Sequence, residues 1–244
     1  MTHPKGRPVS GIAQAYPDRV EVRGRDLAGD LMGRLSFTEY FHLLLTGEEP
    51  TEEQRFFLDL LLVSIAEHGL MPSNVAARMT LAADPGSLHG AVAAGILGAG
   101  PVVLGTSEEC ARLLAEGGEP AEIVRRHREG GKRVPGFGHP VHTPVDPRAE
   151  RILALADERG VAGANVALAR ALRDELGRVM NVSMPIAAVM LDLGFPPAAV
   201  KAVPILARTA SLLAHLAEER EAPTGFALAR AAEEAVEYEP DARS

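Results

Sequence analysis

The sequence predicts an all-α protein. Ala and Leu dominate the composition, aromatic residues make up only 4%, and apolar residues recur at helical spacing between capping and stop signals. Only residues 18–24, DRVEVRG, alternate in the manner of a strand. With 244 residues, 46% of them hydrophobic, the chain is long enough to bury a large core. We expect about nine to eleven helices, with boundaries placed to within a few residues.

Helix starts can be followed along the chain. Ser36 and Glu39 have the spacing of a capping box, and Gly47 ends the apolar-periodic segment that follows them. Thr51 and Gln54 repeat this pattern one helix later. Further starts are expected at Ser73, Ser87, Thr106, Pro120 and Asp146.

The last third of the chain predicts three further helices: ANVALARALRDELG, VSMPIAAVMLDLG and PAAVKAVPILARTASLLAHLAEER. Pro185 and Pro204 fall inside two of them, so each is expected in a first turn or at a kink. The earlier segment LHGAVAAGILGAG is rich in small residues, which allow two helices to approach closely.

Composition limits the function. The formal net charge is -8 and the basic residues are dispersed, which argues against an extended nucleic-acid surface or a polybasic membrane surface. A single cysteine, Cys110, excludes an intramolecular disulfide and a cysteine-based zinc cluster. The first ten residues lack the apolar core of a signal peptide, and no apolar run reaches about 18 residues. We expect a cytoplasmic protein whose partners are small molecules and protein chains.

The segment RVPGFGHPVHTPVDPRAERILALA, residues 133–156, carries the chemistry. His139 stands between Gly138 and Pro140, where its imidazole is uncrowded and suited to donate a hydrogen bond to a carbonyl or alkoxide oxygen. Arg148, in the first turn of the next helix, offers a planar fork for a carboxylate. Taken alone, His139 is also compatible with a loop histidine that has no chemical role. Taken alone, Arg148 is also compatible with a solvated arginine or a surface ion pair. Together they favour a site for an oxo acid or a hydroxy acid.

Three segments resemble the citrate synthase superfamily. RVPGFGHPVH followed by DPRAERILALA is similar to its histidine loop and following helix, VEVRGRDLAGDLMGRLSFTEYFHLLLTGEEPT to its entry helix, and ILARTASLLAHLAEER to its late arginine-bearing helix. The resemblance is collinear from about Val20 to about Tyr238. It implies a homodimer whose subunit has a large helical domain, residues 1–107 and 198–244, and a smaller helical domain, residues 108–197, that closes over substrate.

The histidines distinguish the branches of this superfamily. The synthases carry a second catalytic histidine in a Gly-Pro-x-His-Gly-Gly turn, and here Val103 or Leu104 stands in its place. His89, in SLHG, lies about one helix before the position of this synthase histidine. It is interpreted as a histidine of a helix or of a ligand tunnel. In contrast, AEHGLMPS resembles the Asp-His-Gly stretch of short bacterial citryl-CoA lyases and of the lyase module of ATP-citrate lyase. The resemblance makes His68 a candidate for binding a substrate carboxylate or hydroxyl, whereas the residue alone would read as complementing a helix C-terminus.

One departure concerns the family's catalytic base, an aspartate in an Asn-Val-Asp stretch. The matching MNVSMP retains Asn181, a candidate substrate contact, but places Ser183 where the carboxylate belongs. A serine hydroxyl is a poor base without assistance. The base could then be supplied by Glu67, by Asp192 or by a carboxylate of the substrate.

The resemblance also assigns binding residues. Arg208 matches the carboxylate-binding arginine of the late helix, and Arg230 lies near where a C-terminal arginine reaches the partner subunit's site. Pro140 replaces an arginine that often follows the loop histidine in the lyases. Lys132 and Arg133, with the main-chain amides of Gly136 and Gly138, are the candidate contacts for the phosphates or adenine of coenzyme A, although a solvated basic pair accounts for them equally well.

No metal is expected, because His139 and His142 have no carboxylate or cysteine at a recognisable ligand spacing. The leading hypothesis is a citryl-CoA lyase-like enzyme that makes or breaks a C–C bond between an acetyl-CoA-type enolate and a 2-oxo acid. His139, His68 and Ser183 are its catalytic candidates. Because of Ser183, the alternatives are a non-catalytic homologue that binds acyl-CoA or polycarboxylates and a diverged acyl-CoA enzyme such as a thioester hydrolase.

Overall fold

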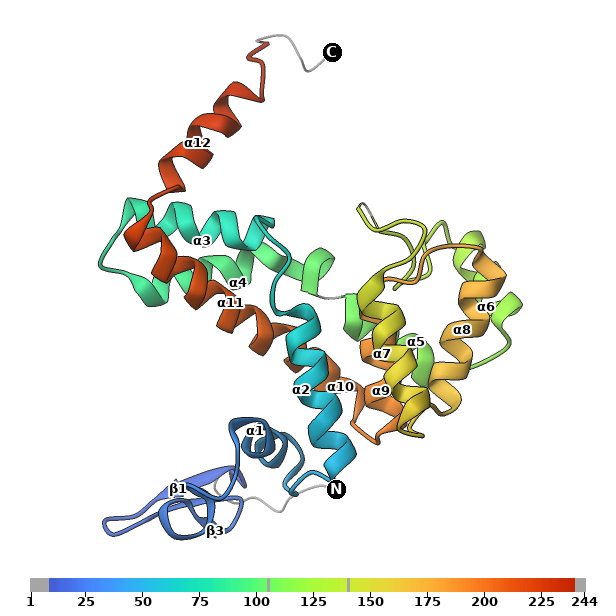
Figure 1. The fold of residues 1–244 in the computed structure, drawn as a ribbon, viewed down its shortest axis with the longest axis horizontal. Helices are drawn as coiled ribbons and strands as arrows, with labels where there is room; N and C mark the ends of the chain where they lie inside the picture. The colour runs from blue at the N-terminus through green and yellow to red at the C-terminus, as the bar shows by residue number, and fades with distance from the viewer. Residues whose placement is uncertain (1–8, 105, 140, 240–244) are drawn as a thin grey trace. The chain divides into compact units, whose positions relative to one another are not determined.

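The computed structural model describes residues 9–104, 106–139 and 141–239. They fall into two compact units, Met1–Asp59 and Leu60–Ser244. The described residues form 12 α-helices and little strand, which confirms the all-α prediction (Figure 1). Ten helices were located in the sequence; the late apolar segment begins with a separate short helix, α10 (Pro197–Val200), and α12 (Gly225–Glu234) was not predicted. The predicted division into domains at residues 107 and 197 stays a prediction.

The N-terminal unit contains a small antiparallel sheet in the order β1 (Ala13–Ala15), β2 (Val20–Val22) and β3 (Arg25–Asp26). Only β2 was predicted: β1 is exposed throughout and lacks the β-branched residues that alternate in β2, and β3 has only two residues. A turn of π-helix, Leu27–Leu31, follows the sheet. Val22, Leu31 and Leu43 form the buried centre of this unit.

The helix starts of this unit are as predicted. In α1 (Phe37–Thr46), Ser36 accepts from the Glu39 amide while the Glu39 side chain accepts from the Ser36 amide, and Gly47 ends the helix with φ 88°. Thr51 and Gln54 make the same reciprocal pair, at 3.2 and 2.9 Å, where α2 (Glu52–Ala66) begins.

The larger unit is built from the remaining helices. In chain order they are α3 (Pro72–Ala83), α4 (Leu88–Leu104), α5 (Thr106–Glu116), α6 (Pro120–Glu129), α7 (Pro147–Glu158), α8 (Ala164–Leu176), α9 (Ser183–Asp192), α10, α11 (Ala202–Glu221) and α12 (Gly225–Glu234). Pro185 and Pro204 lie at the third position of α9 and α11, where a missing N–H costs no helical hydrogen bond, so neither kinks its helix. One predicted cap is wrong: α3 begins at Pro72, and Ser73 instead donates to Asn74 Oδ1.

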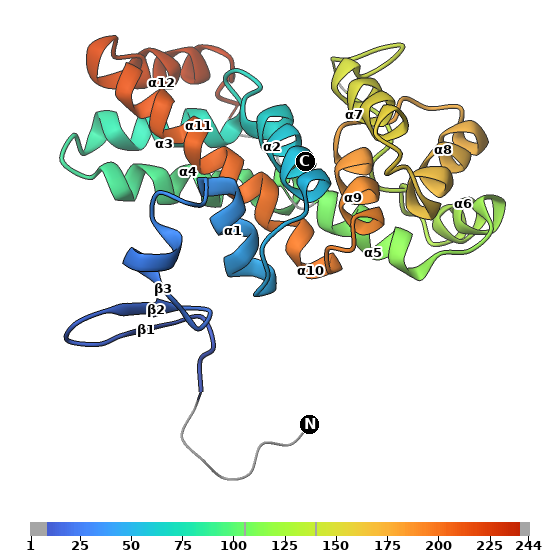
Figure 2. The same cartoon turned by 60° about the horizontal axis from the view of Figure 1, so that its bottom comes forward.

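Helices α3, α4 and α11 pack side by side, as Figures 1 and 2 show. Ala77, Leu81, Ala91, Leu212 and Leu216 form their buried contact. A Cβ on Gly95 would lie only 2.6 Å from Leu212 Cδ2, so the small residues of α4 do permit the close approach that the sequence predicts.

Helix α9 is the buried centre of a second group of helices (Figure 2). Every residue from Ser183 to Met190 is buried, and the helix packs against α5, α7 and α8. This burial fixes the position of its first residue, Ser183, and of the segment that leads into it.

Residues Pro197–Glu221 are long and apolar enough to cross a membrane by composition, which the sequence reading did not anticipate. Half of this segment is buried within the protein. Leu212 and Leu216 of α11 belong to the helical core described above, so a core helix accounts for the composition.

Candidate functional site

The loop that carries His139 requires glycine at two positions. Gly136 and Gly138 have φ values of 83° and 92°, which residues with a Cβ rarely adopt. A Cβ on Gly136 would also lie 2.7 Å from Cys110 Sγ and 2.8 Å from Met184 Cβ. Gly136 is therefore explained by packing and backbone conformation, and its predicted contact with coenzyme A stays a prediction.

Hydrogen bonds hold this loop against the chain that enters α9. Gly138 N donates to Val179 O at 2.7 Å, and Asn181 N donates to Gly136 O at 2.9 Å. The Asn181 side chain donates to Gly138 O at 3.0 Å and accepts from Ser183 N at 3.1 Å. Asn181 thus fixes the loop, in addition to the substrate contact predicted for it.

The backbone sets the tautomer of His139. Its Nδ1 lies 3.1 Å from Val141 N and 2.9 Å from His142 N, and both amides donate to it. Because Nδ1 accepts, the ring proton resides on Nε2. Burial, and next the neighbouring His142, lower the pKa of His139. The site therefore holds a neutral imidazole whose Nε2–H is a donor.

Two further histidines lie beside it. His68, which follows α2, places its Nε2 3.3 Å from His142 Nε2. The ring centroids are 4.3 Å apart for His139 and His142 and 5.5 Å apart for His68 and His139. Burial, followed by Arg148 and His142, lowers the pKa of His68. Sequence reasoning gave His142 no role, because its partner His68 is 74 residues away.

The three histidines offer ligand atoms that all lie within 4.8 Å of one another, a spacing that a metal ion can bridge. Two observations disfavour one. His139 Nδ1 already accepts two amide protons, so a metal on Nε2 would leave the ring without a proton. Arg148 Nη2 also lies 3.5 Å from His139 Nε2 and repels a cation. The prediction that no metal binds stays a prediction.

Arg148 is held by a buried carboxylate. Asp146, only 1% exposed, accepts from Arg148 Nε at 3.0 Å, Nη2 at 2.8 Å and the backbone amide at 3.1 Å. It also accepts from Val182 N at 3.2 Å, beside Ser183. Burial by itself raises the pKa of Asp146, but the hydrogen bonds and charge of Arg148 outweigh it, so the pKa lies below its ordinary value. The sequence identified Asp146 as a helix cap and missed its grip on Arg148.

Arg208 is the opposite case. It lies in α11, is 3% exposed, and its Nη1 donates to Asn74 Oδ1 at 3.2 Å. Its Nε has no hydrogen-bond partner, and no acidic group within the described residues forms an ion pair with it. Burial lowers its pKa, and the negative charge of Glu67 opposes this only in part. Because no ion pair is formed, part of the desolvation cost of this guanidinium is not recovered, and a bound anion would offset it.

These groups line one cavity of about 490 Å³. It brings together eight of the predicted site residues: His68, Arg133, Gly138, His139, Arg148, Asn181, Ser183 and Arg208. Leu104 also lines it, consistent with an apolar residue in place of the synthase histidine. Lys132, Gly136 and Arg230 do not line it, and Arg230 is an exposed residue of α12. Pro140 and the side chain of Val103 lie outside the described parts of the chain.

Neither of the two protein carboxylates that could replace the missing aspartate, Glu67 and Asp192, is free. Burial raises the pKa of Glu67, but hydrogen bonds from Ser211 and His215 and from the amides of residues 68 and 69 outweigh it and lower the pKa to about 2. Asp192 accepts from Gly163 N, Asn165 N and Val166 N at 2.8 to 3.0 Å and so caps α8. Ser183 itself is 9% exposed and begins α9.

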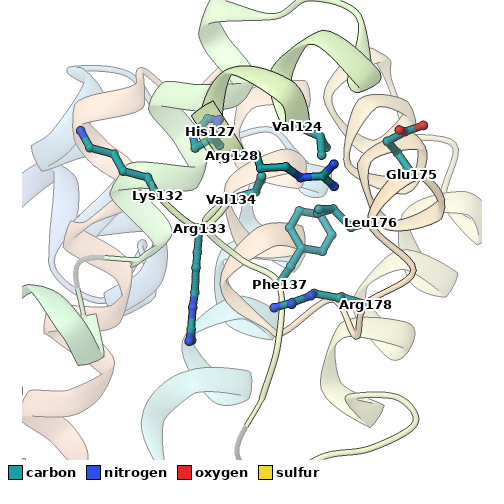
Figure 3. Close-up of a pocket in the computed structure, with 10 residues that line it drawn as sticks. All are labelled: Val124, His127, Arg128, Lys132, Arg133, Val134, Phe137, Glu175, Leu176 and Arg178. Carbon is teal, nitrogen blue, oxygen red and sulfur yellow. The ribbon is translucent and has the colours of Figure 1, made fainter. Parts of the chain in front are cut away.

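A second cavity, of about 300 Å³, adjoins the first through Arg133, which lines both. Its basic residues are Arg128, Lys132, Arg133 and Arg178. In Figure 3 the ring of Phe137 lies between Arg128 and Arg178, and Lys132 points away from it. An apolar ring flanked by guanidinium groups suits a flat aromatic group that carries phosphates.

The fold and the cavity define a helical protein with an anion-accepting site lined by histidines and arginines. A family model for the citrate synthase C-terminal domain matches residues 12–231. The chain belongs to the citrate synthase family, as its sequence motifs indicated.

Individual relatives place it more closely. The structure of citryl-CoA lyase from Hydrogenobacter thermophilus is 32% identical with a TM-score of 0.87, and the match covers 97% of this chain and 96% of that one. Citrate synthase of Haloferax volcanii is 30% identical over 200 residues, covering 77% of this chain and 52% of the relative, so the chain spans about half the length of that synthase. ATP citrate lyase of Methanosaeta concilii, solved with (3S)-citryl-CoA, shares the fold at 18% identity and a TM-score of 0.80, over 98% of this chain and 42% of that one.

Proposed function

We propose that this protein is a citryl-CoA lyase-like enzyme that makes or cleaves the C–C bond between an acetyl-CoA-type enolate and a 2-oxo acid. The observation that carries the proposal is the cavity in which the His139 Nε2 donor, Arg148 and the unpaired Arg208 meet. Similarity to a citryl-CoA lyase over nearly the whole of both chains supports it.

In the cleavage direction, the guanidinium groups of Arg148 and Arg208 bind substrate carboxylates and fix the hydroxyl-bearing carbon. The hydroxyl passes its proton to a neutral imidazole of the site, the oxygen electron pair forms a carbonyl, and the C–C bond breaks to leave the enolate of the thioester. The enolate carbon then takes up a proton. His139 donates a hydrogen bond from Nε2 to the substrate oxygen that passes from alkoxide to carbonyl. A neutral imidazole can stabilise the negative charge on this oxygen while it keeps its own proton. His68 binds the same hydroxyl or a carboxylate.

Coenzyme A is the expected carrier of the acyl group. The second cavity supports this, because its arginines suit phosphates and Phe137 offers a face for an adenine ring. Arg133, which lines both cavities, connects the predicted phosphate contacts with the reacting end. A relative of the same fold was solved with (3S)-citryl-CoA. The proposed enzyme is a cytoplasmic homodimer. Arg230 of each subunit would contribute to the site of the other subunit.

Ser183 favours a second candidate, a homologue that binds acyl-CoA or polycarboxylates without turnover. The two protein carboxylates considered as substitutes, Glu67 and Asp192, are engaged elsewhere, which leaves only a carboxylate of the substrate and favours this alternative. The two candidates differ in turnover and agree in binding.

The test is mass spectrometry of the protein incubated with citryl-CoA, and separately with acetyl-CoA and a set of 2-oxo acids. We expect acetyl-CoA and oxaloacetate from citryl-CoA, with a rate at least about 10²-fold lower for His139→Ala. His89→Gln, which changes an exposed histidine outside the cavity, is the matched control. Binding of citryl-CoA without products would overturn the lyase proposal and favour the non-catalytic candidate.

A further inference from the structure

We propose that His142 and His68 form a proton relay that performs the proton transfer for which position 183 has no carboxylate. This inference rests on the proposed lyase function. The family resemblance assigns no role to His142, which is an otherwise unexplained histidine within the site.

The contact between the two rings carries the argument. Their Nε2 atoms are 3.3 Å apart and the rings meet edge to face, with centroids 5.5 Å apart. Two ring nitrogens at this distance share one hydrogen, so one donates and the other accepts. The contact is independent of the His142 backbone amide, which donates to His139 Nδ1.

The charges around the pair give the relay a direction. Arg148 lowers the pKa of His68, after burial, and so disfavours a lasting positive charge on that ring. After burial, which acts in the opposite sense, and Arg148, His142 is among the groups that lower the pKa of Asp146.

The remaining neighbours do not compete for the proton. His139 faces both rings but is held by the two amides as an Nε2–H donor. Glu67 directs its carboxylate to the amides of residues 68 and 69 and to α11. The route left for a proton from His68 is the contact between its Nε2 and His142 Nε2.

The relay balances the cleavage reaction without another reactant. The substrate O–H bond breaks as His68 accepts the proton at Nδ1, and the proton on His68 Nε2 passes to His142 Nε2. The oxygen electron pair forms the carbonyl, the C–C bond breaks, and its electron pair forms the enolate. The pair then returns a proton to the enolate carbon, so that hydrogen moves from oxygen to carbon overall.

The test compares His142→Gln with the wild-type chain in citryl-CoA cleavage across pH 5 to 9. Glutamine keeps a polar side chain and the backbone amide but cannot accept a proton. We expect kcat to fall about 10²-fold with KM within about threefold, and the acidic limb of the pH profile to move to higher pH, because His68 remains and loses the neighbour that lowers its pKa. His142→Ala should regain activity when imidazole is added, a rescue that a purely structural role would not show. His89→Gln should match the wild type.

Two results would overturn the relay. One is a His142→Gln enzyme within threefold of wild-type kcat at every pH. The other is a stoichiometric metal ion whose removal by a chelator abolishes activity, which would make the histidines ligands instead.

A second measurement separates the relay from the lyase proposal. Nitrogen-15 NMR of the imidazoles follows the titration of His68 in both proteins. We expect the pKa of His68 to be higher in His142→Gln, whether or not citryl-CoA is cleaved, because His142 lowers it. An unchanged titration would show that the rings are not coupled, even in an active enzyme.

Discussion

Arg148 and Arg208 line the same cavity but are supported in opposite ways. Arg148 is partly exposed and is gripped by Asp146 through two side-chain nitrogens and its backbone amide. Arg208 is more deeply buried, and its Nη1 donates only to the neutral side chain of Asn74. The first arginine has a contacting counter-charge within the protein, whereas the second forms no ion pair among the described residues and is influenced only by the more distant charge of Glu67.

The difference separates positioning from binding. Asp146 holds Arg148 in place whether or not a substrate is bound, and a bidentate grip leaves Nη1 available to a ligand. Arg208 gains a contacting counter-charge only when an anion binds, so its interaction contributes to affinity. A site that binds two carboxylates in a fixed orientation benefits from one arginine of each kind.

The largest effect should separate the two arginines in the unliganded protein. Arg148→Met leaves the Asp146 carboxylate buried without its partner, so the free energy of unfolding should fall by about 3 kcal/mol. Arg208→Met removes a buried cation that forms no ion pair and has only the more distant charge of Glu67, so the same free energy should stay unchanged or rise by up to about 1 kcal/mol. Urea denaturation measures both. Equal losses would show that Arg208 has a partner in the folded protein.

A somewhat smaller effect should follow from removing the grip itself. Asp146→Ala loses a helix cap and the contact with Val182 N, and leaves Arg148 to water, so we expect a loss of about 2 kcal/mol. The matched control is Asp157→Ala, which breaks a more exposed ion pair with Arg170 and should cost less than about 1 kcal/mol. Similar losses in the two variants would contradict the role given to Asp146.

The smallest effect concerns pH and the support of His68. The pKa of Glu67 is about 2 in the folded chain against roughly 4.3 when unfolded, so its ionised form stabilises the fold above about pH 4.3. This contribution is lost as pH falls through that range toward 2. Glu67→Gln lacks it, and the stability difference from wild type should shrink between about pH 4.5 and 2. A difference that stays constant down to pH 2.5 would argue against the lowered pKa.

Local signals predicted the helices well. The capping box of Ser36 and Glu39, the paired Thr51 and Gln54 and the cap at Asp146 all involve residues within three positions of each other, so the sequence contains both partners. Strand β1 escaped prediction because its AQA sequence is exposed and has no β-branched residues, and β3 because it has only two residues.

The site was predicted only as far as motifs reach. His68, His139, Arg148 and Arg208 were named from short segments and do line one cavity. Their supports were missed, because the pairing of His142 with His68 and of Arg208 with Asn74 joins residues 74 and 134 positions apart. Such contacts are products of tertiary packing.

The most direct test of this account is calorimetric titration of citrate into the wild-type protein and into Arg208→Met at the same ionic strength. If the buried Arg208 binds a carboxylate of the substrate, the wild type binds citrate and the dissociation constant of the variant is at least about 30-fold higher. Equal affinities would contradict the account, since the unpaired guanidinium would then play no part in binding the substrate.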